Sequence, residues 1–424
     1  MKAFWSSLAR TLSRGTFARN VLVIASGSTL GQLLVVAASP LLTRMYTPEQ
    51  FGVLGVYIAG ILLLSGIATM RYELAIPLPA EDREARSLLQ LALGLSAGFS
   101  ALLLVVSLVG KGFPLAWVGL EELQPYAPFL PLGTWLISSY QSLTYWAVRK
   151  GRYHTLAATK LWQALGNIAV QLVLGITKLG TLGLLLGDAA GRSAGITQLA
   201  RGVPGLFTPS CTGELLQVAR RYSKFPMWSM GSTLINRLGL QLPQLFVATT
   251  FGPREAGWYL LTQRVLGTPI SLVGQAVAQV FLNRIAELRR EDPERAPGFY
   301  LGIVTRMALV GGLPILVGGF LLGEAFGWIF GPEWVPAGRI VQLLTPMFAI
   351  QWTFSPTSQI LIVFERQELQ LLWDASRLVA LAASLYYVRW TGGDVFAAVT
   401  AISMAMSLAY LGLGAMNYHA VRTS

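Results

Sequence analysis

Charged residues, cysteine and histidine are all scarce in this sequence. Only 12% of its 424 residues are Asp, Glu, Lys or Arg, whereas about 25% is usual for a soluble domain. Cys211 is the single cysteine, so no disulfide can form within the chain. His154 and His419 are the only histidines, and no metal-binding, phosphate-loop or nucleophile motif occurs. The sequence therefore predicts no metal site, no cofactor and no enzymatic activity.

Hydrophobic residues are abundant instead and make up 54% of the chain. They form apolar blocks of about twenty residues, each long enough to cross the hydrocarbon core of a bilayer as a helix. We therefore expect an all-α integral membrane protein with about twelve transmembrane helices. The expected spans are residues 20–43, 51–72, 88–110, 126–148, 156–177, 179–198, 226–248, 256–283, 300–322, 338–364, 368–388 and 394–418.

Basic residues outnumber acidic ones by 32 to 20, which gives a formal net charge of +12. If the spans alternate in direction, twenty basic residues fall in loops and chain ends on one side of the membrane and six fall on the other. Because cytoplasmic loops of membrane proteins carry the excess of Lys and Arg, both termini are expected to be cytoplasmic. The basic character is thus a topology signal, and it predicts no nucleic-acid partner.

The sequence also indicates two halves. The stretch 199–225 is rich in Gly, Pro, Ser and Thr and is predicted to be a cytoplasmic linker between six-helix lobes at 20–198 and 226–424. Residues 1–19 are predicted to form a cytoplasmic amphipathic segment.

Two turns support the division into halves. "TPEQFG" begins at Thr47 and "GPREAG" begins at Gly252, and their proline and glycine residues match at one common offset. Since both turns are expected on the same side of the membrane, the lobes would be two pseudo-symmetric bundles around a central cavity.

Polar residues follow one face of several expected spans. In the seventh span, Arg237, Gln241 and Gln244 recur at intervals of four and three residues. Arg264 and Gln275 belong to a similar stripe in the eighth span. Because lipid does not tolerate amide and guanidinium groups on an outward face, these stripes are expected to line a hydrated lumen. Hydrogen bonding between packed helices is the alternative explanation.

Two of the basic residues inside expected spans have an acidic residue close by in sequence. Arg192 follows Asp188 by four residues, and Arg377 follows Asp374 by three. Both spacings allow an ion pair within one helix, so these two arginines are predicted to be structural.

Arg237, Arg264 and Lys160 have no acidic residue within a helical turn of the sequence, so they are candidates for binding a ligand in the lumen. Arg71 and Glu73 lie near the cytoplasmic end of the second span, where they can stand at the mouth of the lumen. A positive-inside anchor with its acidic partner is the competing interpretation of this pair. Guanidinium groups bind phosphate oxygens well, so the charge of the lumen favours a large anion such as a diphosphate head group.

Three segments resemble a known family: "PLLTRMYTPEQFGVLGVYIA", "MRYELAIPLP" and "FGPREAGWYLLTQRVLGTPISLVGQAVAQVFLNRIAE". They are similar to the polysaccharide-transporter branch of the multidrug/oligosaccharidyl-lipid/polysaccharide (MOP) exporter superfamily, the lipid-linked oligosaccharide flippases. The resemblance covers nearly the whole chain and implies two pseudo-symmetric six-helix lobes, a cationic central cavity and alternating access. It matches Arg71 and Glu73 to the family's "R-Y-E" segment and places Arg264 where a cavity cation is expected.

The resemblance implies a flippase that moves a polyprenyl-diphosphate-linked oligosaccharide, as an O-antigen, capsule or exopolysaccharide repeat unit, across the bacterial cytoplasmic (inner) membrane. The expected substrate-binding residues are Arg264, Arg237, Arg71, Lys160, Gln241, Gln244, Gln275 and Glu73. Membrane lipids and glycan polymerase or assembly proteins are the other expected partners. A multidrug exporter of the same superfamily is one alternative, although cationic drugs would require carboxylates in the cavity. A non-transport component or enzyme of glycan assembly is the other alternative.

Overall fold

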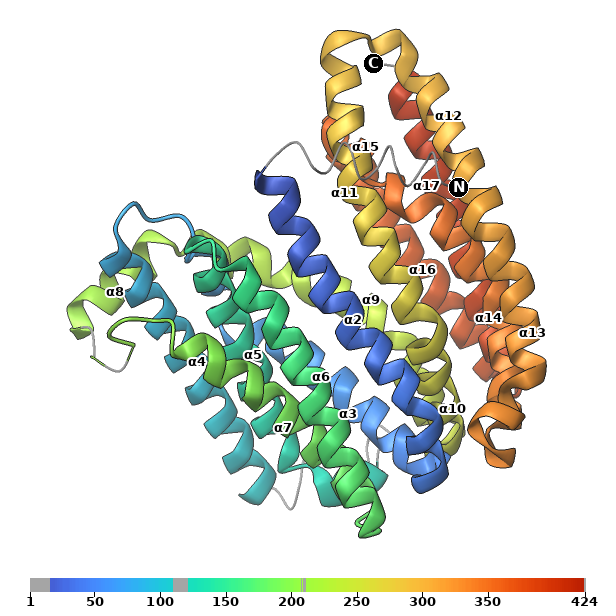
Figure 1. The fold of residues 1–424 in the computed structure, drawn as a ribbon, viewed down its shortest axis with the longest axis horizontal. Helices are drawn as coiled ribbons and strands as arrows, with labels where there is room; N and C mark the ends of the chain where they lie inside the picture. Colours follow the sequence, from blue (N-terminus) through green and yellow to red (C-terminus); the bar gives the residue numbers. More distant parts are fainter. Residues whose placement is uncertain (1–15, 110–120, 207, 209–210, 423–424) are drawn as a thin grey trace. The chain divides into compact units, whose positions relative to one another are not determined.

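The computed structural model describes residues 16–109, 121–206, 208 and 211–422. Helices account for almost all of these residues, and no β-strand occurs among them (Figure 1). The predicted all-α class is therefore confirmed. The predicted amphipathic segment at 1–19 falls mainly outside the described residues, and the first helix begins at Thr16.

Each expected span corresponds to one helix or to a continuous run of helices. Up to residue 251 these are α2 (Thr16–Met45), α3 (Pro48–Ala68), α4 (Asp82–Val109), α5 (Phe129–Arg149), α6 (Tyr153–Ile176), α7 (Thr181–Ala200) and α9 (Met230–Phe251), and α8 (Thr212–Arg221) is an additional helix. From residue 253 onward they are α10 (Pro253–Thr262), α11 (Thr268–Glu291), α12 (Ala296–Met307), α13 (Leu313–Phe330), α14 (Val335–Phe354), α15 (Gln359–Val363), α16 (Gln367–Thr391) and α17 (Val395–Arg422). Helix α8 lies within the stretch that was predicted to be a linker.

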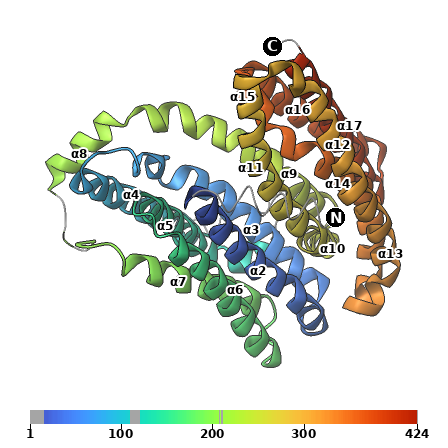
Figure 2. The ribbon, with the colours of Figure 1, turned by 45° about the horizontal axis from the view of Figure 1, so that its top comes forward.

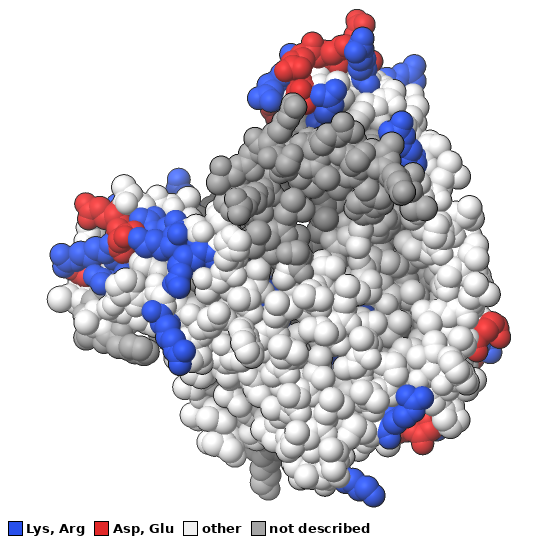
Figure 3. All heavy atoms as spheres, viewed as in Figure 1, with Lys and Arg blue, Asp and Glu red and all other residues white. Residues whose placement is uncertain are grey.

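Several of these helices have the character of membrane spans. By length and mean hydropathy alone, four helices or helix runs of the described chain could cross a bilayer: Pro48–Ala68, Asp82–Val109, Ala296–Phe330 and Val395–Arg422. Large apolar side chains such as Val109 and Trp328 are 80% and 86% exposed, as expected where lipid is the solvent. Figure 3 shows Lys, Arg, Asp and Glu gathered near helix ends, for example around α4 and α8, with uncharged surface along the helices. The chain is an integral membrane protein, and the predicted number of spans stays a prediction.

The chain packs as two compact units. The first unit comprises Ser26–Gly257, and the second unit includes Trp258–Ser424. In the first unit α9 packs against α3, and α8 and α9 belong to the same unit as α3 to α7 and the part of α2 from Ser26 onward. The division by packing falls after Gly257, and the two predicted six-helix lobes stay a prediction. In the second unit α16 and α17 pack together and lie side by side in Figures 1 and 2.

Two expected spans are interrupted by single π-helical turns. Gln263–Gly267 separates α10 from α11, and Ala308–Gly312 separates α12 from α13. In both cases a proline, Pro269 or Pro314, occupies the first turn of the helix that follows. Proline has no N–H and its ring clashes with the carbonyl four residues earlier, so a wider turn before it relieves the clash.

The two turns of the predicted repeat lie against each other in the first unit. A Cβ atom on Gly52 would lie 1.8 Å from the carbonyl oxygen of Pro253, and a Cβ atom on Gly257 would lie 1.9 Å from that of Pro48. Glycine at both positions therefore lets the first turns of α3 and α10 meet through their backbones. The residues that indicated the repeat share one reciprocal contact, while pseudo-symmetry of the whole lobes stays a prediction.

A second glycine-dependent contact joins α13 to α14. Gly319, Gly323 and Gly327 recur every four residues on α13 and face α14. A Cβ atom on Gly323 would lie 2.4 Å from Cγ of Gln342, and one on Gly327 would lie 2.4 Å from Cγ2 of Val335. This small-residue spacing brings two helix backbones close together, which is a common way for helices to associate in membranes.

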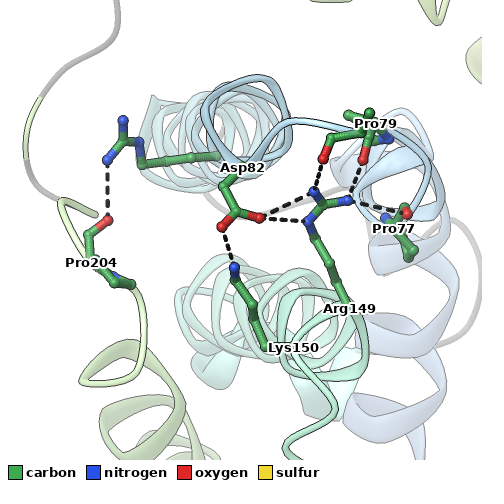
Figure 4. Close-up of polar contacts among 8 residues, drawn as sticks. Pro77, Pro79, Asp82, Arg149, Lys150 and Pro204 are labelled. Atoms are coloured by element: carbon green, nitrogen blue, oxygen red, sulfur yellow. Dashed lines mark hydrogen bonds and ion pairs between the residues drawn. The ribbon is translucent and has the colours of Figure 1, made fainter.

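Arg149, the last residue of α5, holds the loop that precedes α4 (Figure 4). Its guanidinium donates hydrogen bonds to the carbonyl oxygens of Pro77 at 3.3 Å and Pro79 at 2.5 Å, and its Nη2 lies 3.1 Å from Oδ1 of Asp82. The ammonium of Lys150 pairs with the other carboxylate oxygen of Asp82. One arginine thus satisfies several acceptors of an irregular segment.

Replacing Arg149 with alanine is expected to lower the free energy of unfolding by about 1–3 kcal/mol, because partly buried carbonyl oxygens lose their donor. The Arg149 side chain is only 11% exposed, whereas that of Lys150 is 33% exposed. Lys150→Ala is the matched control, and its expected cost is below about 1 kcal/mol. Thermal unfolding of the detergent-purified variants would measure both, and equal losses would contradict the structural role given to Arg149.

Candidate functional site

The candidate site begins at a strained turn after α3. Met70 and Arg71 both have positive φ angles, 50° and 64°, although neither is glycine. Such conformations cost about 1–3 kcal/mol each and concentrate at functional sites. The short 3-10 helix Tyr72–Ala75 follows directly. The turn therefore fixes the direction of the Arg71 side chain relative to the buried helix that follows.

Glu73 is fully buried in this turn, and both of its carboxylate oxygens have a partner. The hydroxyl of Thr69 donates to Oε2 at 2.5 Å, and Nη1 of Arg71 donates to Oε1 at 2.8 Å. A buried carboxylate is tolerated only when it is paired and hydrogen-bonded in this way. The ion pair is compatible with both interpretations of Arg71 and Glu73, the lumen mouth and the anchor.

Arg237 reaches the same region from α9. Its guanidinium donates to the carbonyl oxygen of Leu62 and, at 2.5 Å, to Oγ of Ser65, both on α3. A Cβ atom on Gly66 would lie 3.2 Å from Cδ of Arg237, so the glycine makes room for the arginine side chain. Both hydrogen bonds are made to neutral oxygen atoms, and they leave the positive charge of Arg237 uncompensated by these two partners.

Arg71, Glu73, Tyr145 and Arg237 lie within electrostatic range of one another, and we call them the Arg71–Arg237 cluster. They come from the turn after α3, from α5 and from α9, all within the first unit. The cluster contains two guanidinium groups and one carboxylate. Its excess of positive charge is suited to an anionic ligand.

The other predicted substrate-binding residues of the first unit have different surroundings. The ammonium of Lys160 lies 4.6 Å from the ring centroid of Tyr140, an arrangement that stabilises a cation. Gln241 is half-buried on α9. Gln244 is buried, and its amide donates to the carbonyl oxygen of Ala256 at 3.1 Å. This packing role leaves Gln244 out of the proposed ligand set.

Arg264 and Gln275 belong to the second unit. Arg264 lies in the π-helical turn between α10 and α11, and Gln275 is exposed on α11. The predicted substrate-binding residues are therefore divided between the two compact units, and a lumen shared by both units stays a prediction.

The two predicted intrahelical ion pairs are confirmed. Nε of Arg192 lies 2.7 Å from Oδ2 of Asp188, and Nη2 of Arg377 lies 3.3 Å from Oδ1 of Asp374. The described residues contain no group of three or more His, Cys, Asp or Glu side chains that could hold a metal ion.

The family of the chain is shown by a sequence comparison. The model of a family described as "polysaccharide biosynthesis protein" matches residues 41–338. The chain belongs to this polysaccharide biosynthesis protein family. The match includes the Arg71–Arg237 cluster and both turns of the predicted repeat, and it extends into α14.

Three curated relatives of this family member are named for the biosynthesis of succinoglycan, teichuronic acid or amylovoran. The succinoglycan biosynthesis transport protein ExoT of Rhizobium meliloti is 25% identical over 79% of this chain and 66% of its own length. The teichuronic acid biosynthesis protein TuaB of Bacillus subtilis is 25% identical over 42% of this chain and 36% of its own length. The amylovoran biosynthesis protein AmsL of Erwinia amylovora is 24% identical over 43% of this chain and 47% of its own length. The chain thus spans less than two thirds of the length of each of these relatives.

Solved structures show which fold the family member has. An inward-facing multidrug-resistance MATE transporter of the MOP superfamily superimposes with a TM-score of 0.72 at 14% identity, covering 95% of this chain and 99% of the transporter. The lipid II flippase MurJ, in an inward closed conformation, gives a TM-score of 0.71 at 11% identity, covering 92% of this chain and 86% of the MurJ chain. The fold is therefore that of MOP-superfamily transporters, as the resemblance implied.

Proposed function

We propose that this family member is a flippase that moves a polyprenyl-diphosphate-linked oligosaccharide across the bacterial cytoplasmic membrane by alternating access, with both termini in the cytoplasm. The observation that carries the proposal is the excess positive charge of the Arg71–Arg237 cluster inside a membrane protein with the fold of MOP transporters. In this proposal the chain is a carrier and performs no covalent chemistry.

The energetic cost of the cluster supports a ligand-binding role. Arg237 lies within α9, and an arginine in a membrane helix costs up to about 2.5–3.5 kcal/mol at the helix centre, so such residues are usually retained for a function. Leu62 and Ser65 offer Arg237 only neutral oxygens, and the single carboxylate of Glu73, which is paired with Arg71, can balance only one of the two guanidinium groups. A diphosphate group supplies the missing negative charge and accepts several hydrogen bonds from guanidinium groups.

The proposed substrate-binding residues have different roles. Arg237 and Arg71 bind the diphosphate, while Glu73 orients Arg71 and limits the charge of the empty site. Lys160 and Gln241 of the first unit and Arg264 and Gln275 of the second complete the polar lining along the path of the glycan. The polyprenyl tail stays in the lipid.

The names of the curated relatives support the substrate class. One of them is called a transport protein of succinoglycan biosynthesis, and the others are named for teichuronic acid and amylovoran. All three names concern polysaccharides, and cell-surface polymers of this kind are assembled from units that must cross the membrane. We accordingly propose a repeat unit of an O-antigen, capsule or exopolysaccharide as the cargo.

The test is glycan export in a host strain that lacks its own flippase of this pathway. Arg237→Ala and Arg71→Ala are each expected to lower export about 10- to 100-fold, since each loses charge-assisted hydrogen bonds worth about 1.5–3 kcal/mol. Surface glycan and the amount of lipid-linked repeat unit retained in the cytoplasmic leaflet would be measured together. Arg306→Ala, at an exposed position of α12, is the matched control and is expected to export normally.

Normal export by the double variant Arg71→Ala/Arg237→Ala would overturn the proposal. A multidrug exporter is the second candidate, because the MATE transporters share the fold. Resistance to cationic dyes in cells that express the protein would favour this candidate.

A further inference from the structure

A cavity of about 190 Å³ with both polar and apolar walls lies in the second unit and opens to its surface at Ser271 and Gln275. It is formed by α11 and by the segment where α14 ends and the 3-10 turn Ser355–Thr357 begins. Three glutamines, three serines and one tryptophan contribute to its wall, among them Gln275, Gln351, Gln359, Ser355 and Trp352. The proposed function uses only Gln275 of this set, so the cavity as a whole has no role in the phosphate-binding argument.

The break in the helix explains why polar groups gather at this cavity. Pro356 cannot donate a backbone hydrogen bond and stops α14, and a short turn connects α14 to α15. Ser355 and Gln359 flank this break and both line the cavity. Irregular backbone at the depth of a membrane is stable where it is buried in protein or lines a polar cavity.

Trp352 is held in one orientation at the cavity wall. Its indole N–H donates to the carbonyl oxygen of Met307 at 3.2 Å. A Cβ atom on Gly311 would lie 1.9 Å from the same indole nitrogen, so glycine at this position admits the edge of the ring. Both partners belong to the region of the π-helical turn Ala308–Gly312. The indole is therefore a rigid aromatic surface, which loses little conformational entropy when a ligand stacks on it.

The chemistry of the lining selects the class of ligand. None of the described lining residues carries a charge, so the cavity offers nothing that would compensate a diphosphate. Amides and hydroxyls supply both donors and acceptors, as the hydroxyl groups of a sugar require. The negative face of an indole attracts the weakly positive C–H groups on one side of a sugar ring. The combination fits an uncharged saccharide.

The size of the cavity limits how much of a glycan it can hold. Pockets for drug-sized ligands measure about 300–1,000 Å³. A volume of about 190 Å³ is smaller and suits a single sugar ring rather than a whole oligosaccharide. Ordered water is the competing occupant, since a polar cavity of this size holds several water molecules.

We propose that this cavity binds one uncharged sugar ring of the translocated glycan, with the ring stacked on Trp352 and its hydroxyl groups bonded to Gln275, Gln351 and Gln359. The inference rests on the proposed function and adds to it a subsite for sugar recognition, separate from the Arg71–Arg237 cluster. The substrate preference of the protein would then depend on these neutral residues as well as on the arginines.

The experiment measures direct binding to the detergent-purified full chain. The probes are methyl glycosides of neutral hexoses and N-acetylhexosamines, the methyl glycoside of glucuronic acid, and inorganic diphosphate, each titrated by calorimetry and by saturation-transfer NMR. Trp352→Ala and Gln275→Leu are expected to weaken neutral glycoside binding at least about tenfold, or about 1.4 kcal/mol, without changing diphosphate binding. Trp352→Phe keeps a flat ring and is expected to retain part of the affinity.

Two controls separate this inference from the proposed function. Trp328→Ala removes a tryptophan that is 86% exposed on α13 of the same unit and should leave glycoside binding unchanged. Arg237→Ala should lose diphosphate binding and keep glycoside binding. If the double variant Arg71→Ala/Arg237→Ala exports glycan normally while Trp352→Ala loses glycoside binding, the proposed function fails and the sugar subsite stands.

Several results would overturn the sugar subsite. They are the absence of binding by every neutral glycoside in the set, binding that Trp352→Ala and Gln275→Leu leave unchanged, and tighter binding of the glucuronide than of the neutral glycosides. Because Gln275 is exposed, Gln275→Leu tests the proposal even if Trp352→Ala does not fold.

Discussion

Gly52→Ala is expected to reduce the yield of folded protein severely, although it adds only one methyl group. The new Cβ atom would lie 1.8 Å from the carbonyl oxygen of Pro253, far inside the roughly 3.5 Å at which non-bonded heavy atoms are in favourable contact. The clash is with backbone, so a change of rotamer cannot relieve it, and the first turns of α3 and α10 must separate. The expected cost is about 3 kcal/mol or more, at the upper end for overpacking.

Gly257→Ala should behave in the same way, because its Cβ atom would lie 1.9 Å from the carbonyl oxygen of Pro48. Gly94→Ala is the matched control: this residue lies on α4 and a Cβ atom there would meet nothing within 4 Å. Alanine is the better helix former, so the control is expected to be neutral or slightly stabilising. Size-exclusion profiles and thermal unfolding midpoints would measure the effect, and a wild-type midpoint for Gly52→Ala would disprove the close contact.

Glu73→Ala is expected to destabilise the protein by about 2–4 kcal/mol. Removing one partner of a fully buried ion pair costs about 3–5 kcal/mol, and the 15% exposure of the Arg71 side chain reduces this somewhat. The variant also leaves Arg71 and Arg237 as neighbouring like charges without their carboxylate. Loss of Glu73 should therefore lower the unfolding midpoint and, in addition, raise the affinity for inorganic diphosphate.

Two further variants separate charge from packing at Glu73. Glu73→Gln keeps the shape and hydrogen-bonding oxygen, so it should cost less than Glu73→Ala. The double variant Arg71→Ala/Glu73→Ala should be more stable than Glu73→Ala alone, since it removes the orphaned guanidinium. Additive effects of the two single changes would show that the pair contributes nothing, contrary to the geometry.

Local sequence patterns predicted local structure well. The spacing of four and three residues in the Asp188–Arg192 and Asp374–Arg377 pairs was sufficient to place both ion pairs, because a helix brings such residues together whatever surrounds it. The apolar blocks likewise located the helices, since hydrophobic length is a strong signal in a membrane protein.

The same sequence patterns could not predict which residues on different helices contact one another. Arg237 and Gln244 lie on the same helical face of α9. Arg237 contacts α3, whereas the side-chain amide of Gln244 donates a hydrogen bond to the carbonyl oxygen of Ala256. Periodicity assigns a residue to a face but does not say which neighbour covers each turn of that face. For the same reason the sequence did not show that Asp82 would pair with two basic residues at the end of α5.

The glycine contacts could have been anticipated more fully. Gly319, Gly323 and Gly327 show the four-residue spacing of small residues that is typical of close helix pairs, and that spacing is readable without a structure. The reciprocal contact of Gly52 and Gly257 is different. A repeated motif indicates that two segments are alike, but it does not reveal that they touch each other.

The hydrogen bond between Trp352 and Met307 makes the position of the indole at the cavity wall sensitive to the shape of another helix. The carbonyl group of Met307 stands at the start of the π-helical turn, where the regular i to i+4 bonding is shifted. If that turn were rewound into a regular α-helix, the Met307 carbonyl group and Gly311 would move relative to the indole, and this hydrogen bond would be disturbed. The orientation of Trp352, and with it the proposed binding of a sugar, would then depend on the conformation of the turn between α12 and α13 within the second unit.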